Sequence, residues 1–398
     1  MLMWWQNGAF NQRLLNSGSE NRTRKMKLLR KILYITFYLF EKMQIPVMFF
    51  YSWKFGQLKH LEKEELTIWI RSMQRMLKDY CQAAYNFRIH RMINAFALTK
   101  VEIIRQQELP DYIEPIVVLC VKNEMARIKM LVEHYRRFGV KRFAFLDNNS
   151  DDGTFEWLLE QEDVDLYKTE QKYETVVKEG WINRLISYYG FDRWYIVTDS
   201  DELMEWIGME KHPISEMIRY AAAHGIKRFK GLTLDTYTNG EAFVRTENIM
   251  YDYRFVDRDS YFIKTISTGT TTLDQFYGGP RNRLMGVTVP LSKYPLVYFE
   301  KGTISVSAHY FYPIELNNVD SCYVAILHYK FIDKDREEFK RRAQNNSGFS
   351  SNGRHYKQML EHLDTSFSFM YDGSIEIMSS YDLSNIALIE RIPFDSYE

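Results

Sequence analysis

The sequence predicts an α/β domain, a Rossmann-like and mostly parallel sheet flanked by helices, that follows a helical N-terminal region. Three observations support this fold class. Beyond Pro115, short apolar runs alternate with amphipathic stretches of helical period, which is typical of parallel-sheet domains. The 398 residues are 45% hydrophobic and 16% aromatic, enough to bury a large core. Prolines at 110 and 115 interrupt the preceding helical pattern, since the residue before a proline avoids helical geometry.

The apolar runs after residue 115 predict the strands, and the stretches between them predict the helices. The runs IVVLCV at 116–121 and WYIVT at 194–198 are largely apolar, as expected of strands buried on both faces. We expect the second of these runs to be a central strand. In chain order the expected elements are strand 116–121, helix 124–138, strand 142–146, helix 154–160, strand 164–167, helix 176–189 and strand 194–198.

The two prolines also place the predicted domain boundary. Residues 1–112 are expected to form the helical region, because the pattern from 58 to about 107 is helical and contains no glycine or proline. Residues 113–390 are expected to form the α/β domain. The chain therefore has two predicted parts of different architecture.

The N-terminal region contains an aromatic, apolar stretch next to many basic residues. Neither apolar piece, 32–40 or 47–53, reaches the roughly 20 residues that a membrane-spanning helix needs. The flank 13–42 holds eight basic and two acidic residues, which suits a helix lying on an anionic membrane surface. We therefore expect peripheral membrane contact through residues 22–53. The alternative is that these aromatic residues pack on the rest of the protein.

Charge and cysteine content exclude several classes of protein. Lys plus Arg and Asp plus Glu each number 52, so no overall positive charge attracts nucleic acid, and we expect no nucleic-acid partner. The three cysteines lie far apart and form no CxxC pair, which argues against a disulfide framework and a structural zinc site. A cytoplasmic location, at the inner face of the plasma membrane if the membrane prediction holds, is the expectation.

Polar residues cluster directly after three of the predicted strands. The first cluster contains Asn123 and Glu124, the second spans 147–154, and the third is the run DSDE at 199–202. In a parallel sheet, ligands bind outside the carboxyl ends of the strands. Although such residues also cap helices and form turns, three clusters at corresponding strand ends indicate a binding site.

The third cluster predicts a metal site. Asp199 and Asp201 stand at i and i+2 after a buried strand, so their carboxylates point the same way if the chain stays extended. Two such oxygen ligands suit Mg²⁺ or Mn²⁺, which also bind phosphate oxygens of substrates. The alternative is an acidic helix N-cap.

Three motifs carry a resemblance to a known family. The segments VVLCVKNE (117–124), FLDNNSDDGT (145–154) and WYIVTDSDEL (194–203) resemble the nucleotide-sugar domain of the glycosyltransferase family 2 superfamily, which has the GT-A fold. The DSD run resembles the DxD motif of that family. Later blocks, among them LTLDTYTNG (232–240) and YGGPRNRLMG (277–286), look like a bacterial subgroup that builds surface polysaccharides.

The resemblance implies how a nucleotide-diphospho-sugar donor binds. Residues 113–205 would form the nucleotide-sugar half and residues 206–390 the acceptor half. Asp147 would contact the base or ribose, and Asp199 and Asp201 would bridge the metal to the diphosphate. The expected donor-binding residues are Asn123, Glu124, Asp147, Asn149, Asp152, Asp199 and Arg281.

The resemblance also implies inversion at the anomeric carbon, which requires a carboxylate base near the acceptor hydroxyl. Asp235, after the apolar run 229–234, is the candidate base, and Asp274 is the second choice. A histidine often completes the metal site in this fold. His328 is the candidate third ligand beside Asp199 and Asp201, and His309 is the rival.

The expected function is a metal-dependent glycosyltransferase of the hexosyltransferase type. It would transfer a sugar from the donor to a saccharide acceptor during surface polysaccharide synthesis, using Mn²⁺ or Mg²⁺. The alternative is a catalytically silent sugar-binding or scaffolding protein that keeps the fold.

Overall fold

The structure is a computed structural model, and it describes residue 96 and residues 98–111, 114–267, 271–344, 354–363 and 366–394. All of these residues belong to one compact unit, Gln57–Glu398. Most of the predicted N-terminal region, including the segment 22–53, lies outside the described residues. No helix within the described ranges is long and apolar enough to cross a membrane.

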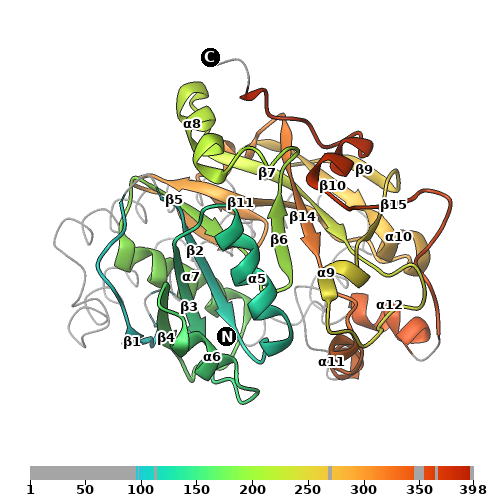
Figure 1. The fold of residues 1–398 in the computed structure, drawn as a ribbon, viewed down its shortest axis with the longest axis horizontal. Coiled ribbons are helices and arrows are strands. Elements are labelled where there is room, and N and C mark those ends of the chain that lie inside the picture. The colour runs from blue at the N-terminus through green and yellow to red at the C-terminus, as the bar shows by residue number, and fades with distance from the viewer. Residues whose placement is uncertain are drawn as a thin grey trace, which may run out of the picture. The chain divides into compact units, whose positions relative to one another are not determined.

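A nine-stranded mixed sheet organises the described part of the chain (Figure 1). Strands β2, β3, β4 and β5 are mutually parallel. Strand β11 is antiparallel to both β5 and β7, and β14 is parallel to β7, so β7 and β14 run in the direction of β5. In spatial order the strands are β1 (Glu102–Arg105), β4 (Val164–Lys168), β3 (Arg142–Asp147), β2 (Ile116–Val121), β5 (Arg193–Val197), β11 (Ser292–Phe299), β7 (Arg228–Asp235), β14 (Cys322–His328) and β6 (Glu202–Glu205).

The predicted α/β class is confirmed by the first half of this sheet. Helices α5 (Met125–Arg137), α6 (Thr154–Glu160) and α7 (Thr175–Tyr189) connect its parallel strands, as the alternating pattern predicts. The run at 194–198 corresponds to β5, the middle strand of the nine. The parallel strands predicted from the sequence are present, and antiparallel strands are added beside them.

Side chains of β2 alternate between two cores because successive strand residues face opposite sides of a sheet. Val117 and Leu119 join the core that contains Leu131 of α5. Ile116 and Val118 join the core that contains Trp181 of α7. Helices α5 and α7 therefore cover opposite faces of the sheet. All six residues of β2 except Cys120 are buried, which explains why the strand reads as an uninterrupted apolar run.

Strand β1 corrects the prediction that the helical pattern extends to about residue 107. Residues 102–105 pair antiparallel with β4 at the edge of the sheet. The Arg105 guanidinium donates to the carbonyl oxygens of Leu159, at 2.7 Å, and Val164, at 3.0 Å. Edge pairing and these hydrogen bonds join residues 102–105 to distant parts of the chain. A local helical pattern cannot predict such partners. The sheet therefore begins before the predicted boundary at 112.

The second half of the chain adds short helices and three two-stranded ribbons around strands β7, β11, β14 and β6. The ribbons are β8 (Phe255–Asp257) with β15 (Ser374–Glu376), β9 (Tyr261–Ser267) with β10 (Thr272–Gly278), and β12 (Ile304–Ser307) with β13 (Tyr310–Tyr312). The helices are α8 (Ile214–His224), α9 (Ile249–Asp252), α10 (Gly279–Met285), α11 (Asp333–Gln344) and α12 (Arg354–Leu363), with 3₁₀ turns at Ile314–Asn317 and Ser380–Asn385.

Candidate functional site

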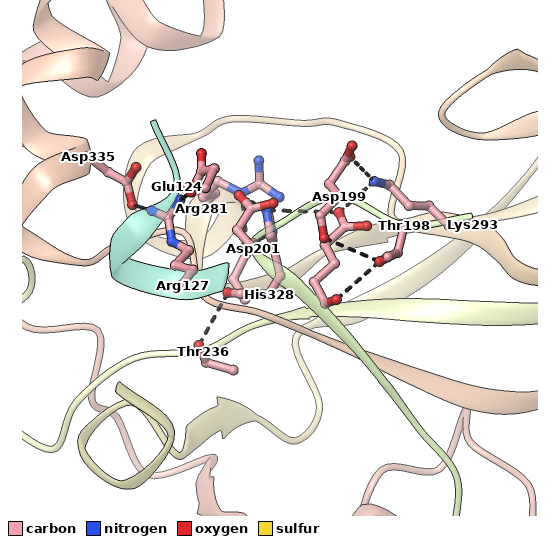
Figure 2. A network of polar contacts seen from close by, with 12 residues as sticks. Glu124, Arg127, Thr198, Asp199, Asp201, Thr236, Arg281, Lys293, His328 and Asp335 are labelled. Carbon is pink, nitrogen blue, oxygen red and sulfur yellow. Dashed lines mark hydrogen bonds and ion pairs between the residues drawn. The ribbon is translucent and has the colours of Figure 1, made fainter. Parts of the chain in front are cut away.

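The carboxyl ends of β5, β7 and β14 lie at the same edge of the sheet because these strands share one direction. Asp235 is the last residue of β7 and His328 is the last residue of β14, and the two are paired in register. His328 is also paired with Glu202, the first residue of the antiparallel strand β6. Backbone pairing therefore places Asp235, His328 and Glu202 in one row across three strands, and Asp199 and Asp201 enter it from the end of β5 (Figure 2).

The His328 imidazole connects the acidic groups of this row. Its Nδ1 lies 2.7 Å from Oδ1 of Asp235, and its Nε2 lies 3.2 Å from Oδ2 of Asp201. Its Nε2 is also 4.0 Å from Oε1 of Glu202. Burial by itself would lower the pKa of His328, but the carboxylates of Asp201 and Asp235 outweigh it and raise that pKa. The imidazole is therefore held between carboxylates on both sides.

Three of these side chains form a group that suits a metal ion. One ligand atom each of Asp201, Glu202 and His328 lie within 4.8 Å of one another. Two carboxylates and an imidazole are suitable ligands for Mn²⁺ or Mg²⁺. Asp235 supplies the carboxylate that typically orients a metal-binding histidine from its other nitrogen. The group contains Asp201 and His328 of the set expected from the sequence, and Glu202 in addition.

Asp199 lies next to this group and contacts two lysines. Its Oδ2 accepts from Lys293 at 2.9 Å, and its Oδ1 accepts from Lys178. Burial would raise the pKa of Asp199, but the two ammonium groups hold it well below its usual range. Lys293 also donates to Oε1 of Glu202 at 2.5 Å, so this lysine links Asp199 to the metal-binding group.

Asp235 is buried and uses both of its oxygens. Its side chain is 0% exposed. Oδ1 faces His328, and Oδ2 accepts from Nε of Arg281 at 2.6 Å. Although burial opposes ionisation, Arg281 and His328 lower the pKa of Asp235 to about 2. The carboxylate therefore stays ionised and engaged on both sides.

A glycine pair at the start of α10 brings Arg281 to Asp235. Gly278 has a φ of +105°, and a Cβ there would lie 2.2 Å from the carbonyl oxygen of Ser260. Gly279 has a φ of +74°, and a Cβ there would lie 3.3 Å from the Tyr261 ring. At Gly278 a side chain would displace the backbone of Ser260, and at Gly279 the positive φ favours glycine. This close approach explains the GG pair in the block 277–286.

The alternative residues named from the sequence have other contacts. Asp274 is exposed on β10 and accepts from Thr265 at 2.5 Å; it lines a separate cavity of about 290 Å³ with Lys230. His309 lies between β12 and β13 with its Nδ1 2.9 Å from the carbonyl oxygen of Ser292. His328 is the histidine that contacts both Asp201 and Asp235.

The loops after β2 and β3 are tied together at the same edge. The Asn123 side chain exchanges hydrogen bonds with Asp151, donating to its Oδ1 at 2.8 Å and accepting from its backbone N–H at 2.9 Å. Asp152 accepts from the backbone N–H groups of Met125 and Thr154, both at 3.0 Å, and so caps α5 and α6 together. Asn149 has a φ of 61°, which asparagine tolerates. The capping interpretation of this loop is therefore correct.

Asp147 and Glu124 have different surroundings at this edge. Asp147 is fully buried; its Oδ1 accepts from the Ser150 N–H at 2.9 Å, while its Oδ2 has no hydrogen-bond partner within the described ranges. Glu124 accepts from Arg127 and from Lys334, each at 3.1 Å. Burial raises the pKa of Glu124 even though these cations oppose the shift.

Several residues of the network carry no motif in the sequence. Arg127 on α5 forms a buried ion pair with Asp335 on α11 (Figure 2), and Lys178 comes from the first turn of α7. Arg283 pairs with Asp257 at 2.9 Å. Only tertiary packing identifies these partners, because the two members of each pair come from different elements of the fold.

Comparison with known proteins identifies no close relative. No family model and no curated protein matches the chain. The solved structure of TarS from S. aureus matches with a TM-score of 0.30 and 13% identity over 63% of this chain and 42% of that chain. UDP-glucose pyrophosphorylase from Acinetobacter baumannii matches with a TM-score of 0.28 and 10% identity over 63% of this chain and 100% of that chain. The chain thus matches less than half of the TarS chain, and its α/β class rests on its own sheet topology.

Proposed function

We propose that this protein is a metal-dependent glycosyltransferase that uses a nucleotide-diphospho-sugar. The observation that supports this most directly is the group of Asp201, Glu202 and His328, with Asp199 and two lysines beside it, at the carboxyl edge of a parallel sheet. This edge is where α/β sheets bind ligands. The loops with the nucleotide-sugar-like motifs, after β2 and β3, lie at the same edge.

The residues of the group would have distinct tasks. Asp201, Glu202 and His328 would hold Mn²⁺ or Mg²⁺, and such a cation would neutralise the negative charge that develops on the departing nucleoside diphosphate. Asp235 would orient His328 through its Nδ1. Asn123, Glu124, Asp147, Asn149 and Asp152 would form or support the nucleotide side of the site.

Two roles for Asp235 follow from different arguments. The family resemblance suggests the general base of an inverting transfer, with Asp274 as the second choice. The contacts favour a positioning role, because both oxygens of Asp235 are engaged and its side chain is 0% exposed. A base must reach the acceptor hydroxyl within hydrogen-bond distance. The saccharide acceptor, inversion and a role in bacterial surface polysaccharide synthesis on the cytoplasmic side belong to this proposal through the resemblance alone.

The test compares donor binding and turnover in the wild type and in Asp201→Asn. A panel of nucleotide sugars is titrated with and without Mn²⁺ by calorimetry, and hydrolysis or transfer is followed by chromatography. Asp201→Asn should keep the thermal unfolding profile and lose metal-dependent donor binding. The matched control is Asp320→Asn, which removes the same charge at an exposed position.

Each outcome separates the alternatives. Unchanged donor affinity and turnover in Asp201→Asn would refute the metal-dependent mechanism. Wild-type binding of a nucleotide sugar without turnover under any metal condition would instead indicate the catalytically silent sugar-binding protein.

A further inference from the structure

We propose that Lys178 and Lys293 bind the diphosphate of the donor, and that Asp199 holds these two lysines in place instead of binding the metal. The inference rests on the proposed function, which supplies the diphosphate. It assigns the acidic run after β5 two separate tasks: anchoring of an anion-binding pair by Asp199, and metal binding by Asp201 and Glu202.

The two lysines reach Asp199 from different elements. Lys178 lies in the first turn of α7, and Lys293 lies near the start of β11. Each lysine side chain is 13% exposed, and each contacts a different oxygen of Asp199. Figure 2 shows Lys293 and Asp199 facing each other beside His328. Both oxygens of Asp199 are thus occupied by ammonium groups.

The charges around Asp199 are balanced as the structure stands. Two ammonium groups share the carboxylate of Asp199, Lys293 also contacts Glu202, and Glu179 lines the cavity beside them. Glu202 also belongs to the metal-binding group, so a bound cation would compete with Lys293 for its carboxylate. A phosphate that took the place of Asp199 would contact both ammonium groups in a partly buried site, where such charged hydrogen bonds are strong.

The space beside the lysines explains how an anion would enter. A small cavity of about 20 Å³ is lined by Lys178, Asp199 and Lys293 together with Thr198 and Ser307. This volume holds about one water-sized atom, which matches one phosphate oxygen but not a whole phosphate. Further oxygens would have to take the place of the Asp199 carboxylate on the lysines. Asp199 therefore competes with the anion that we propose the lysines bind.

Helix α7 adds a favourable contribution. It starts at Thr175, and its N-cap residue Glu174 makes no side-chain capping hydrogen bond. The first backbone N–H groups of a 15-residue helix carry a partial positive charge. Lys178 and this helix end therefore present positive charge from the same element.

The experiment measures anion and metal binding separately in the full chain, without a sugar donor. Inorganic pyrophosphate is titrated by calorimetry in the presence of a chelator. Lys178→Gln and Lys293→Gln should each weaken its binding about 10- to 100-fold, the scale of a lost charged hydrogen bond. Lys178→Arg and Lys293→Arg should recover most of it. Lys264→Gln, an exposed lysine on β9, is the control, and thermal unfolding verifies that each variant folds.

Asp199→Asn tests whether removal of the Asp199 charge raises or lowers the affinity for pyrophosphate. If Asp199 anchors the lysines and competes with phosphate, this variant should bind pyrophosphate as tightly as the wild type or more tightly. Its affinity for Mn²⁺, titrated alone, should stay within about threefold of the wild type, whereas Asp201→Asn loses Mn²⁺ binding. A large loss of Mn²⁺ affinity in Asp199→Asn, or wild-type pyrophosphate binding in both glutamine variants, would overturn the inference.

These readouts distinguish failure of the inference from failure of the proposed function. Lysine-dependent pyrophosphate binding without turnover of any nucleotide sugar would leave the anion site standing and refute the glycosyltransferase. Turnover of a nucleotide sugar at the wild-type rate in both glutamine variants would support the glycosyltransferase and refute the anion site.

Discussion

His328 Nδ1 lies 2.7 Å from Oδ1 of Asp235, its register partner on the neighbouring parallel strand. An ionised carboxylate only accepts hydrogen bonds, so Nδ1 must carry a proton and donate. Nε2 faces the Asp201 carboxylate at 3.2 Å and donates to it in the same way, which agrees with the raised pKa of His328. A cation bound at Nε2 would displace that proton, and Asp235 would then hold the remaining proton on Nδ1.

The first prediction concerns Asp235→Asn. The amide removes the charge that stabilises the His328 N–H and places an uncharged group against Arg281. If Asp235 positions His328, Mn²⁺ affinity should fall about 10- to 100-fold, the usual range for removal of such an orienting partner. Calorimetric titration with MnCl₂ measures this directly.

The same variant tests the base role. A general base would leave Mn²⁺ affinity and donor binding at the wild-type level and lower the transfer rate about 100-fold or more. The matched variant Asp274→Asn should leave Mn²⁺ binding unchanged, because Asp274 is exposed on β10. A rate loss confined to Asp274→Asn would move the base role there.

The second prediction concerns the ion pair between Arg127 and Asp335, whose side chains are 3% and 10% exposed. Arg127→Met leaves the carboxylates of Asp335 and Glu124 buried without this partner. Removal of one member of a buried pair typically costs about 3–5 kcal/mol, so the free energy of unfolding in urea should fall by that amount.

A double variant serves as the control for this ion pair. Arg127→Met combined with Asp335→Leu removes both charges and should recover part of the lost free energy. Equal losses in the single and double variants would show that Arg127 acts through packing and Glu124, and not through Asp335.

The third prediction concerns the pH dependence of stability through Glu205. Burial raises the pKa of Glu205 to about 8, and neighbouring Glu210 adds to the shift. In the unfolded chain the pKa is near its ordinary value of 4.5. The protonated group therefore stabilises the fold fully below about pH 4.5, and this contribution is lost as the pH rises toward 8.

Glu205→Gln should remove this dependence. Between about pH 5 and about pH 8, the wild type should lose stability relative to the variant by up to about 1.4 kcal/mol per pH unit. Urea unfolding across this range measures the difference. The exposed Glu247 provides the control, and parallel pH profiles for wild type and Glu205→Gln would contradict the assignment.

The fourth prediction concerns the basic segment 22–53, which lies outside the described residues. If it binds an anionic membrane surface, replacing Arg24, Lys25, Arg30 and Lys31 by glutamine should release the protein from anionic vesicles, because each contributes about 1 kcal/mol near such a surface. Sedimentation with vesicles measures the bound fraction, and added salt should lower it. Equal binding to neutral and anionic vesicles would favour packing on the rest of the protein. Four exposed lysines elsewhere serve as the matched control: Lys141, Lys211, Lys264 and Lys357.

The sequence by itself determined the parallel strands of the sheet and the loops at their ends. Residues 116–121 and 154–160 form the predicted strand and helix with the same bounds. Local patterning suffices there because a strand buried on both faces must be apolar throughout and a helix must show its own period. The position of the acidic run after β5 follows from the same local rules.

Only the tertiary structure decided which side chains meet. His328 is 93 residues from Asp235 and 127 from Asp201, and Lys293 is 94 residues from Asp199. Register between non-consecutive strands sets these contacts, and no local period encodes it. Likewise, β1 forms because an edge of β4 is available to pair with residues 102–105. Local sequence specifies the elements, whereas charge pairing and burial across distant segments determine the site.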